Sequence, residues 1–343
     1  MLVTARRISV AALALGITLV LATDGPALAN EGKKRGNGKT SATKKDNKVG
    51  AAARITFQVS GKGVKGSGPV TSVDPNWTPP ACWYAPRWTP DEFEESRQRL
   101  TVAAAHDPGL GNEVRNDISD ENQEYAKDDY NRDKEGEGMW WAAEFSPDAT
   151  LTEQQKCMDP PFWVKKGENP DVPQAINPEM LAALAYKQIE VPGTKVELAP
   201  EGASKVNLPT WAWLDKGEFS PVSVTASVEA PGLRIEATTT AKPVALTLKP
   251  GTDDAELLPA SGLCELNGDG SIGEPYAKGK ADTTPPCGVV YRRSSDGGSF
   301  NLQATATWKI TWTGSGGAGG TLPDGEYGND QPVTVEEVQS VNR

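Results

Sequence analysis

The stretch from Ser299 to Thr313 constrains the fold of this chain more than any other segment. Its apolar residues recur at every second position, with a polar residue at each position between them. They are Phe300, Leu302, Ala304, Ala306, Trp308, Ile310 and Trp312. Successive side chains of a β-strand point to opposite faces, so a period of two places these residues on one face. The pattern predicts a strand with one buried face, with Trp308 and Trp312 in the core.

Shorter runs with the same period occur through the last part of the chain. They lie at residues 222–228, 233–237, 244–248, 289–291 and 333–335, and the Pro231-Gly232 pair separates two of them as a tight turn does. About seven short strands, each polar on one face, favour two antiparallel sheets packed face to face. We therefore predict an immunoglobulin-like antiparallel β-sandwich domain at residues 191–343.

Residues 54–190 differ from this pattern, because they are rich in Trp, Pro and acidic residues. Only residues 55–59 alternate as a strand does. Two helices are predicted from their first residues. Thr89, Pro90 and Glu92 form a capping box with proline at the first helical position, so a helix should run to about residue 105. Asn177 and Pro178 begin the other helix in the same way.

Within this acidic part, residues 113–137 carry many carboxylates without a sustained apolar period. An amphipathic helix needs such a period to bury one face. We therefore expect an exposed irregular segment or a frayed helix here. Residues 54–190 are interpreted as an irregular α+β domain stapled by a disulfide, and the whole chain belongs to the α+β class.

The N-terminus has the organisation of a secretory signal peptide. Arg6 and Arg7 precede an apolar run of about fifteen residues, shorter than the roughly twenty that span a bilayer, and Ala27-Leu28-Ala29 forms an A-x-A cleavage site. We predict cleavage after Ala29 by either the Sec or the twin-arginine route, no stable membrane anchor afterwards, and a secreted product. Residues 30–53 are rich in Lys and poor in apolar residues, which predicts a disordered basic linker. Adhesion to an anionic envelope polymer is the alternative interpretation of this linker.

Four cysteines in an exported chain indicate two disulfides, which allow three pairings. The proposed boundary near residue 190 separates Cys82 and Cys157 from Cys264 and Cys287. We therefore predict the pairs Cys82–Cys157 and Cys264–Cys287, each within one domain.

Charge and motifs exclude several classes of function. The chain has a net charge of -11, which makes nucleic acid a poor partner. Gly36-Asn37-Gly38-Lys39-Thr40 resembles part of a phosphate-binding loop, but Lys33 stands where the first glycine is required, so we expect no nucleotide and no cofactor. His106 is the single histidine, and no G-x-S-x-G motif supplies a nucleophile for it. We place His106 on the last turn of the first helix, and the catalytic residues, if any, stay unknown.

Two groups of residues are candidate ligand sites. Glu265, Asn267 and Asp269 are spaced like the first half of a calcium loop, but Tyr276 stands where a bidentate carboxylate is needed. A plain glycine-rich turn is therefore the preferred interpretation, and a calcium site is the alternative. The tryptophans offer ring faces on which a sugar can stack. Trp211, Trp213, Trp83 and Trp88 are the candidates for ligand binding. For the tryptophans near the first two cysteines, a compact core is the preferred interpretation, and an exposed stacking platform is the alternative.

Four segments resemble those of secreted actinobacterial proteins of unknown function. They are residues 76–86 (NWTPPACWYAP), 157–164 (CMDPPFWV), 207–213 (NLPTWAW) and 304–323 (ATATWKITWTGSGGAGGTLP). The resemblance implies export from a Gram-positive actinobacterium and two domains, and supplies no catalytic residues. Some such proteins carry the automatic name ATP/GTP-binding protein, which the incomplete phosphate-binding loop argues against here.

Together these features predict an exported cell-envelope or extracellular protein that acts as a binding or structural module. Its expected partner is a cell-wall polymer or another envelope protein. A secreted hydrolase that cleaves envelope glycan through paired carboxylates is the alternative, but the 46 acidic residues give no spacing from which to choose the pair.

Overall fold

The computed structural model describes residues 55–60, 67–168, 170–214, 219–280 and 283–338. By their internal contacts, residues 1–48 and residues 49–343 form two separate units, and every described residue belongs to the second. The predicted signal peptide and basic linker, residues 1–53, lie outside the described residues.

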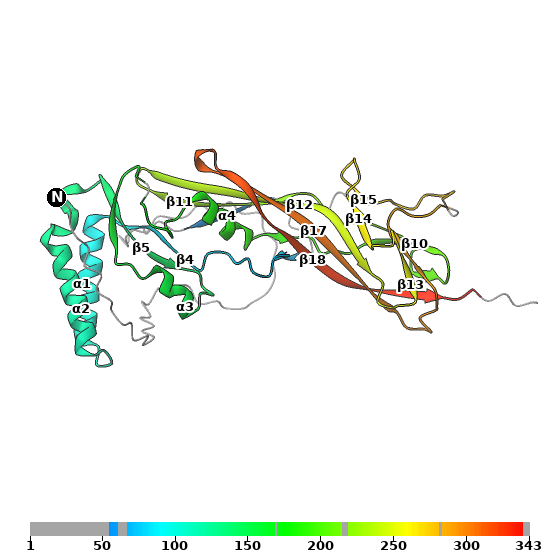
Figure 1. Ribbon diagram of the computed structural model, residues 1–343, viewed down its shortest axis with the longest axis horizontal. Helices are drawn as coiled ribbons and strands as arrows, with labels where there is room; N and C mark the ends of the chain where they lie inside the picture. Colours follow the sequence, from blue (N-terminus) through cyan, green and yellow to red (C-terminus); the bar gives the residue numbers. More distant parts are fainter. Residues whose placement is uncertain (1–54, 61–66, 169, 215–218, 281–282, 339–343) are drawn as a thin grey trace, which may run out of the picture. The chain divides into compact units, whose positions relative to one another are not determined.

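A three-stranded antiparallel sheet is built from the Trp-rich part of the chain (Figure 1). It consists of β4 (Cys82–Trp88), β5 (Gly138–Phe145) and β6 (Phe162–Lys165). Trp83, Trp140 and Trp141 are buried, while Trp77, Trp88 and Trp163 are half-buried and pack against the core. The interpretation of these tryptophans as a compact core is confirmed.

Helix α1 (Pro90–His106) begins at the predicted residue. The Thr89 hydroxyl accepts a hydrogen bond from the Glu92 backbone N–H, and the Glu92 carboxylate accepts one from the Thr89 N–H at 3.0 Å. This reciprocal capping box confirms the predicted helix start. His106 lies on the last turn, where its Nδ1 is 2.8 Å from the Val102 carbonyl oxygen.

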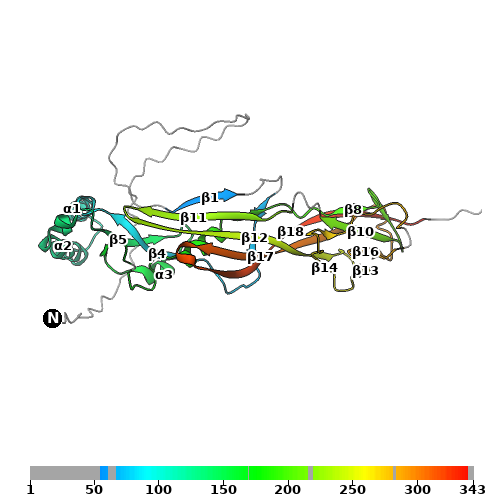
Figure 2. The ribbon, with the colours of Figure 1, turned by 90° about the horizontal axis from the view of Figure 1, so that it is seen from above.

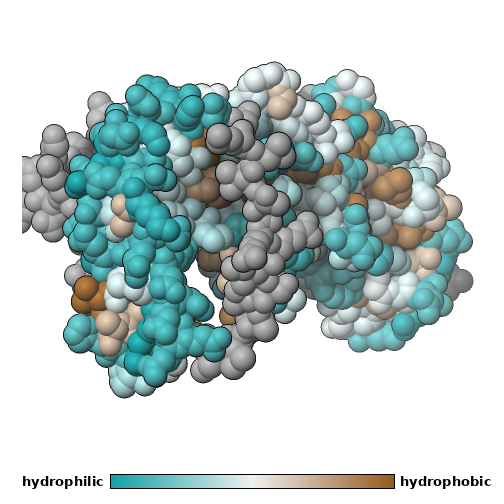
Figure 3. All heavy atoms as spheres, turned by 60° about the vertical axis from the view of Figure 1, so that its left-hand side comes forward, coloured by the Kyte–Doolittle hydropathy of each residue, from teal (hydrophilic) through white to brown (hydrophobic). Residues whose placement is uncertain are grey.

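The segment expected to be either irregular or a frayed helix contains a helix, α2 (Asn112–Lys127), followed by the 3-10 turn η1 (Asp129–Lys134). The irregular alternative was wrong. Exposure is confirmed for α2, in which no residue is buried and over which the surface is largely hydrophilic (Figure 3), but Tyr130 and Asn131 of η1 are buried. The buried Arg97 of α1 bonds to Glu121 at 2.8 Å and lies over the Tyr125 ring. Contacts to α1 therefore stabilise a helix that lacks an apolar stripe.

The largest sheet has eight strands (Figures 1 and 2). Its main path is β1 (Thr56–Ser60), β11 (Val222–Ala230), β12 (Leu233–Lys249), β17 (Phe300–Gly314), β18 (Gly319–Glu336) and β3 (Thr71–Ser72). Strand β14 (Leu263–Glu265) pairs with β12, and β9 (Ala203–Lys205) pairs in parallel with β18. Strand β17 confirms the predicted alternation, because Trp308 and Trp312 are 0% and 8% exposed.

Helix α4 (Pro178–Tyr186) packs against this sheet, on β12 and β11. The Asn177 side chain accepts a hydrogen bond from the Met180 N–H at 2.9 Å, which confirms the predicted cap. On the sheet side, the buried Thr239 hydroxyl donates to the Ala182 carbonyl oxygen at 2.8 Å. The helix thus covers apolar sheet residues that water would otherwise reach.

A five-stranded sheet completes the β-structure. Its strands are β13 (Ala255–Leu258), β16 (Gly288–Tyr291), β10 (Pro209–Leu214) and β15 (Ile272–Gly273), with β8 (Glu197–Ala199) paired to β10. The short elements are β2 (Gly68–Pro69), β7 (Glu190–Val191), α3 (Leu151–Gln154), η2 (Gln155–Cys157) and η3 (Ser315–Gly317). The fold is mostly antiparallel β-sheet with a few helices, which is consistent with the α+β class.

Both predicted disulfides are present. Cys82 pairs with Cys157 and Cys264 with Cys287, with Cα–Cα distances of 6.1 and 5.5 Å. One continuous apolar cluster includes residues on both sides of position 190, from Trp83 to Val335, while the domain boundary itself stays a prediction. Among the described residues, every helix is too short or too polar for a bilayer span.

Candidate functional site

A hollow of about 530 Å³ lies where β1, α4 and the three-stranded sheet meet. We call it the aromatic hollow. Its lining is Ile55, Phe57, Trp83, Arg87, Glu144, Phe145, Ser146, Pro147, Asp148, Leu184, Lys187 and Gln188. The volume falls within the range of roughly 300–1,000 Å³ that is typical of ligand sites. The mixture of aromatic and charged side chains makes this the strongest candidate site.

Strand pairing explains how distant residues reach the hollow. Trp83 of β4 lies opposite Glu144 of β5, and Phe145 follows at the end of that strand. Phe57 comes from β1, which pairs with β11 with Phe57 opposite Ala226. Three segments far apart in the sequence are thereby brought to one place.

Phe57 and Phe145 are each 40% exposed, so both present ring surface to solvent. Trp83, by contrast, is 8% exposed, and its indole N–H has no hydrogen-bond partner among the described residues. Trp83 therefore contributes a buried wall of the hollow. The exposed apolar surface comes from the two phenylalanines.

The charged groups of the hollow are paired with one another. Arg87 Nη1 lies 3.3 Å from Glu144 Oε1 and also donates to the Ala143 carbonyl oxygen at 3.3 Å. Lys187 forms an ion pair with Asp148. Because each carboxylate faces a cation, the hollow has little net charge to offer a ligand.

The other tryptophan candidates lie elsewhere. Trp88 is half-buried beneath the guanidinium of Arg87, at 4.7 Å from its ring centroid, and does not line the hollow. Trp211 is buried and lines a second hollow of about 260 Å³, where it meets the exposed Tyr276 edge-on at 5.8 Å. Trp213 is half-buried on the same strand, β10, and lines neither hollow. The structure therefore brings Trp83 alone of the four to the aromatic hollow.

The calcium candidates lie in a hydrogen-bonded turn. Asp269 Oδ1 accepts from the Ser271 N–H at 3.0 Å, and the Asn267 amide donates to the Gly273 carbonyl oxygen at 2.8 Å. Glu265 ends β14 beside this turn. Within the described ranges, no three His, Cys, Asp or Glu side chains are grouped as metal ligands. The geometry is that of an ordinary turn, stabilised by its own polar groups.

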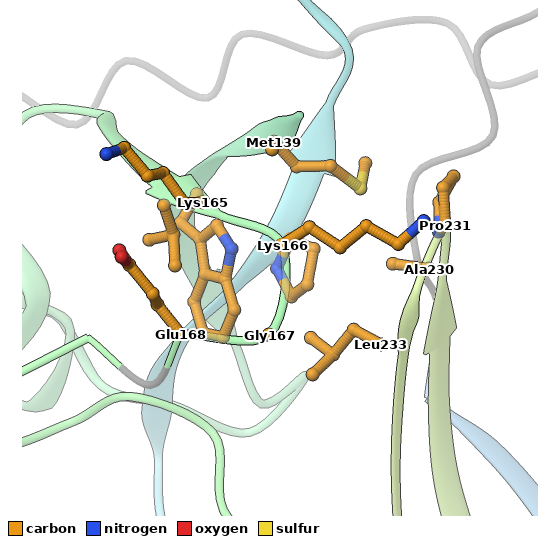
Figure 4. A pocket seen from close by; sticks show the side chains of 12 residues that line it. Met139, Lys165, Lys166, Gly167, Glu168, Ala230, Pro231 and Leu233 are labelled. Atoms are coloured by element: carbon orange, nitrogen blue, oxygen red, sulfur yellow. The ribbon is translucent and has the colours of Figure 1, made fainter. Parts of the chain in front are cut away.

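A narrow gap of about 20 Å³ separates the loop after β6 from the β11–β12 turn (Figure 4). Lys166 extends across it toward Pro231, and its Cε would lie 1.8 Å from a Cβ placed on Gly232. This gap is too small for a ligand. It is a packing contact between the two loops. Gly232 in the turn has a φ of 75°, a backbone conformation that favours glycine.

Sequence reasoning missed the residues that define the hollow, namely Phe57, Phe145, Arg87 and Lys187. The alternation at residues 55–59 predicted the strand that carries Phe57, but not that its inward face stays partly uncovered. No family model matches the chain, and no curated protein or solved structure matches it either.

Proposed function

We propose that the protein is exported and acts at the cell envelope as a binding module, through the aromatic hollow. The proposal includes the sequence-based expectations: cleavage after Ala29, an actinobacterial source, an immunoglobulin-like C-terminal domain and a location outside the cell. Both disulfides are consistent with an oxidising compartment.

One observation carries the proposal. Two exposed phenylalanines flank a hollow whose charged groups already have partners. Exposed aromatic surface that gathers in a concavity is typical of binding sites, since a ligand there removes apolar area from water. Paired charges add polar contacts without the cost of desolvating an isolated ion.

The hydrolase alternative has less support. A glycosidase needs two carboxylates across one cleft, one with a raised pKa so that it can act as the acid. Burial, together with the nearby Asp91 and Glu92, raises the pKa of Glu135. Glu135 does not line the aromatic hollow. The carboxylates that do, Glu144 and Asp148, each face a cation.

Co-sedimentation tests the proposal directly. The mature chain, residues 30–343, is incubated with purified cell walls that retain their associated proteins. We expect the protein to pellet without release of soluble sugar, and Phe145→Ser to lower the bound fraction. Tyr276→Ser is the matched control, because Tyr276 is 42% exposed and lies outside the hollow.

Failure to pellet at low salt would contradict envelope binding. Equal retention of the Phe145→Ser variant and the parent at high salt, where the attraction of residues 30–53 is screened, would remove the hollow from the proposal. Sugar released into the supernatant would instead support the hydrolase.

A further inference from the structure

Among the described strands, β1 has one hydrogen-bonding edge to which no other strand pairs. It is the first strand in the order of the large sheet and pairs on one side with β11, while no described strand pairs with its other side. All five of its residues are exposed. The backbone N–H and C=O groups along such an edge can pair with another extended chain.

The free edge borders the aromatic hollow. Phe57 of β1 and the preceding Ile55 both line it, and their positions differ by two, so they share one face of the strand. An added strand would place alternate side chains on this same face. Its apolar residues would then meet Phe57 and Phe145.

The charges of the chain restrict what such a strand can be. The hollow itself is nearly neutral, so it favours uncharged side chains. The segment that joins the chain just before Ile55, residues 30–53, has seven basic and two acidic residues. Because this cationic sequence continues directly into β1, we expect a partner of β1 to carry acidic residues outside the seated part.

We infer that the aromatic hollow and the free edge of β1 bind an extended segment of another protein by strand addition. The segment has apolar residues at alternate positions and acidic residues flanking them. This inference rests on the proposed binding function and names its ligand class. Glycan fits less well, because the indole that lines the hollow, Trp83, is buried and offers no free face for sugar stacking.

The test uses the mature chain and a displayed library of short linear peptides of random sequence. We expect enriched peptides to share the alternating apolar pattern with acidic flanks and to slow amide hydrogen exchange at residues 56–60. Phe57→Ser should weaken their binding by about ten-fold or more, whereas the Tyr276→Ser control should not. If the selection enriches no peptides of this pattern, the inference is overturned. It is also overturned if the Phe57→Ser variant binds the enriched peptides as tightly as the parent does.

Two proline variants test the backbone pairing. Gln58→Pro and Val59→Pro each remove one N–H, and neighbouring residues of a strand direct their N–H groups to opposite edges. One of the two variants loses an N–H that bonds to β11 and should unfold at a lower temperature than the parent. The other loses an N–H on the opposite edge, keeps its pairing with β11 and should unfold near the temperature of the parent. That variant should lose peptide binding, and undiminished binding by it would rule out strand addition.

Walls stripped of protein, tested at high salt so that the attraction of residues 30–53 is screened, separate this inference from the proposed function. If stripped walls still retain the parent but not the Phe57→Ser variant, the hollow binds glycan, so the binding function stands and strand addition fails. If only walls with their proteins retain the parent, both stand. If neither preparation retains it, the envelope function fails, and the peptide library alone decides the inference.

Discussion

Tyr291 shows how burial of a single residue sets a property that can be measured. The residue is fully buried on β16, and its ring stacks on Phe300 with centroids 5.3 Å apart. Burial raises the pKa of Tyr291 from its ordinary value of 10.0 to about 12. The phenolate is disfavoured in this environment because it would lose its hydration.

The raised pKa predicts a loss of stability in alkali. Below pH 10 the tyrosine is protonated in the folded and unfolded states alike. Between pH 10 and 12 the unfolded state releases this proton while the folded state keeps it, so the free energy of unfolding falls. We expect urea unfolding of Tyr291→Phe to depend less on pH in this range than that of the parent. The exposed Tyr276→Phe variant should follow the parent, and identical slopes for all three proteins would contradict the argument.

At the same scale, the sequence predicted burial better than exposure. The alternation at residues 299–313 correctly placed Trp308 and Trp312 in the core, because a regular strand has one buried face. It did not indicate that Phe57 would stay exposed. Phe57 stays exposed because no described strand pairs with β1 on the side away from β11. The order of strands in a sheet cannot be predicted from the alternation within one strand.

Elements with local signals were predicted well, whereas elements that depend on a partner were not. Capping residues fixed the starts of α1 and α4. Strand β18 extends from Gly319 to Glu336, but only residues 333–335 had shown strand character in the sequence. Its first half is rich in glycine and lacks alternation, and it is ordered by pairing with the regular β17, with one shift in register at Trp308/Ile310.

Helix α2 is a second element of this kind, and its contact with α1 predicts a specific weakness. Arg97 is 5% exposed, and its Nη2 bonds to Glu121. Glu121→Ala leaves this buried cation without its partner, which should destabilise the docking of α2 by about 1–3 kcal/mol. Faster amide hydrogen exchange within α2 would report the loss.

The matched control lies on the same helix. Glu124 pairs with Lys127 on the exposed surface, so Glu124→Ala should change stability by less than about 0.5 kcal/mol. Equal effects of the two substitutions would show that the Arg97 contact does not hold α2 in place.

At the scale of the whole molecule, the net charge conceals two opposite parts. Residues 1–54 hold ten basic and three acidic groups, a net charge of +7, so the remaining chain must carry -18 to give the total of -11. After cleavage at Ala29, residues 30–53 carry seven basic and two acidic groups ahead of a body with net negative charge. An anionic partner is therefore attracted by this segment and repelled by the rest.

This division predicts two separable components of envelope binding. Attraction by residues 30–53 is screened by salt, since the Debye length falls to about 3 Å at 1 M ionic strength, whereas apolar contacts in the hollow are not. We expect deletion of residues 30–53 to abolish the salt-dependent part of wall co-sedimentation and Phe145→Ser to lower the part that persists in high salt. A chain of unchanged length, with the seven basic residues of this segment replaced by Gln, should behave like the deletion. If this neutral variant keeps the salt dependence of the parent, another surface of the molecule makes the anionic contact.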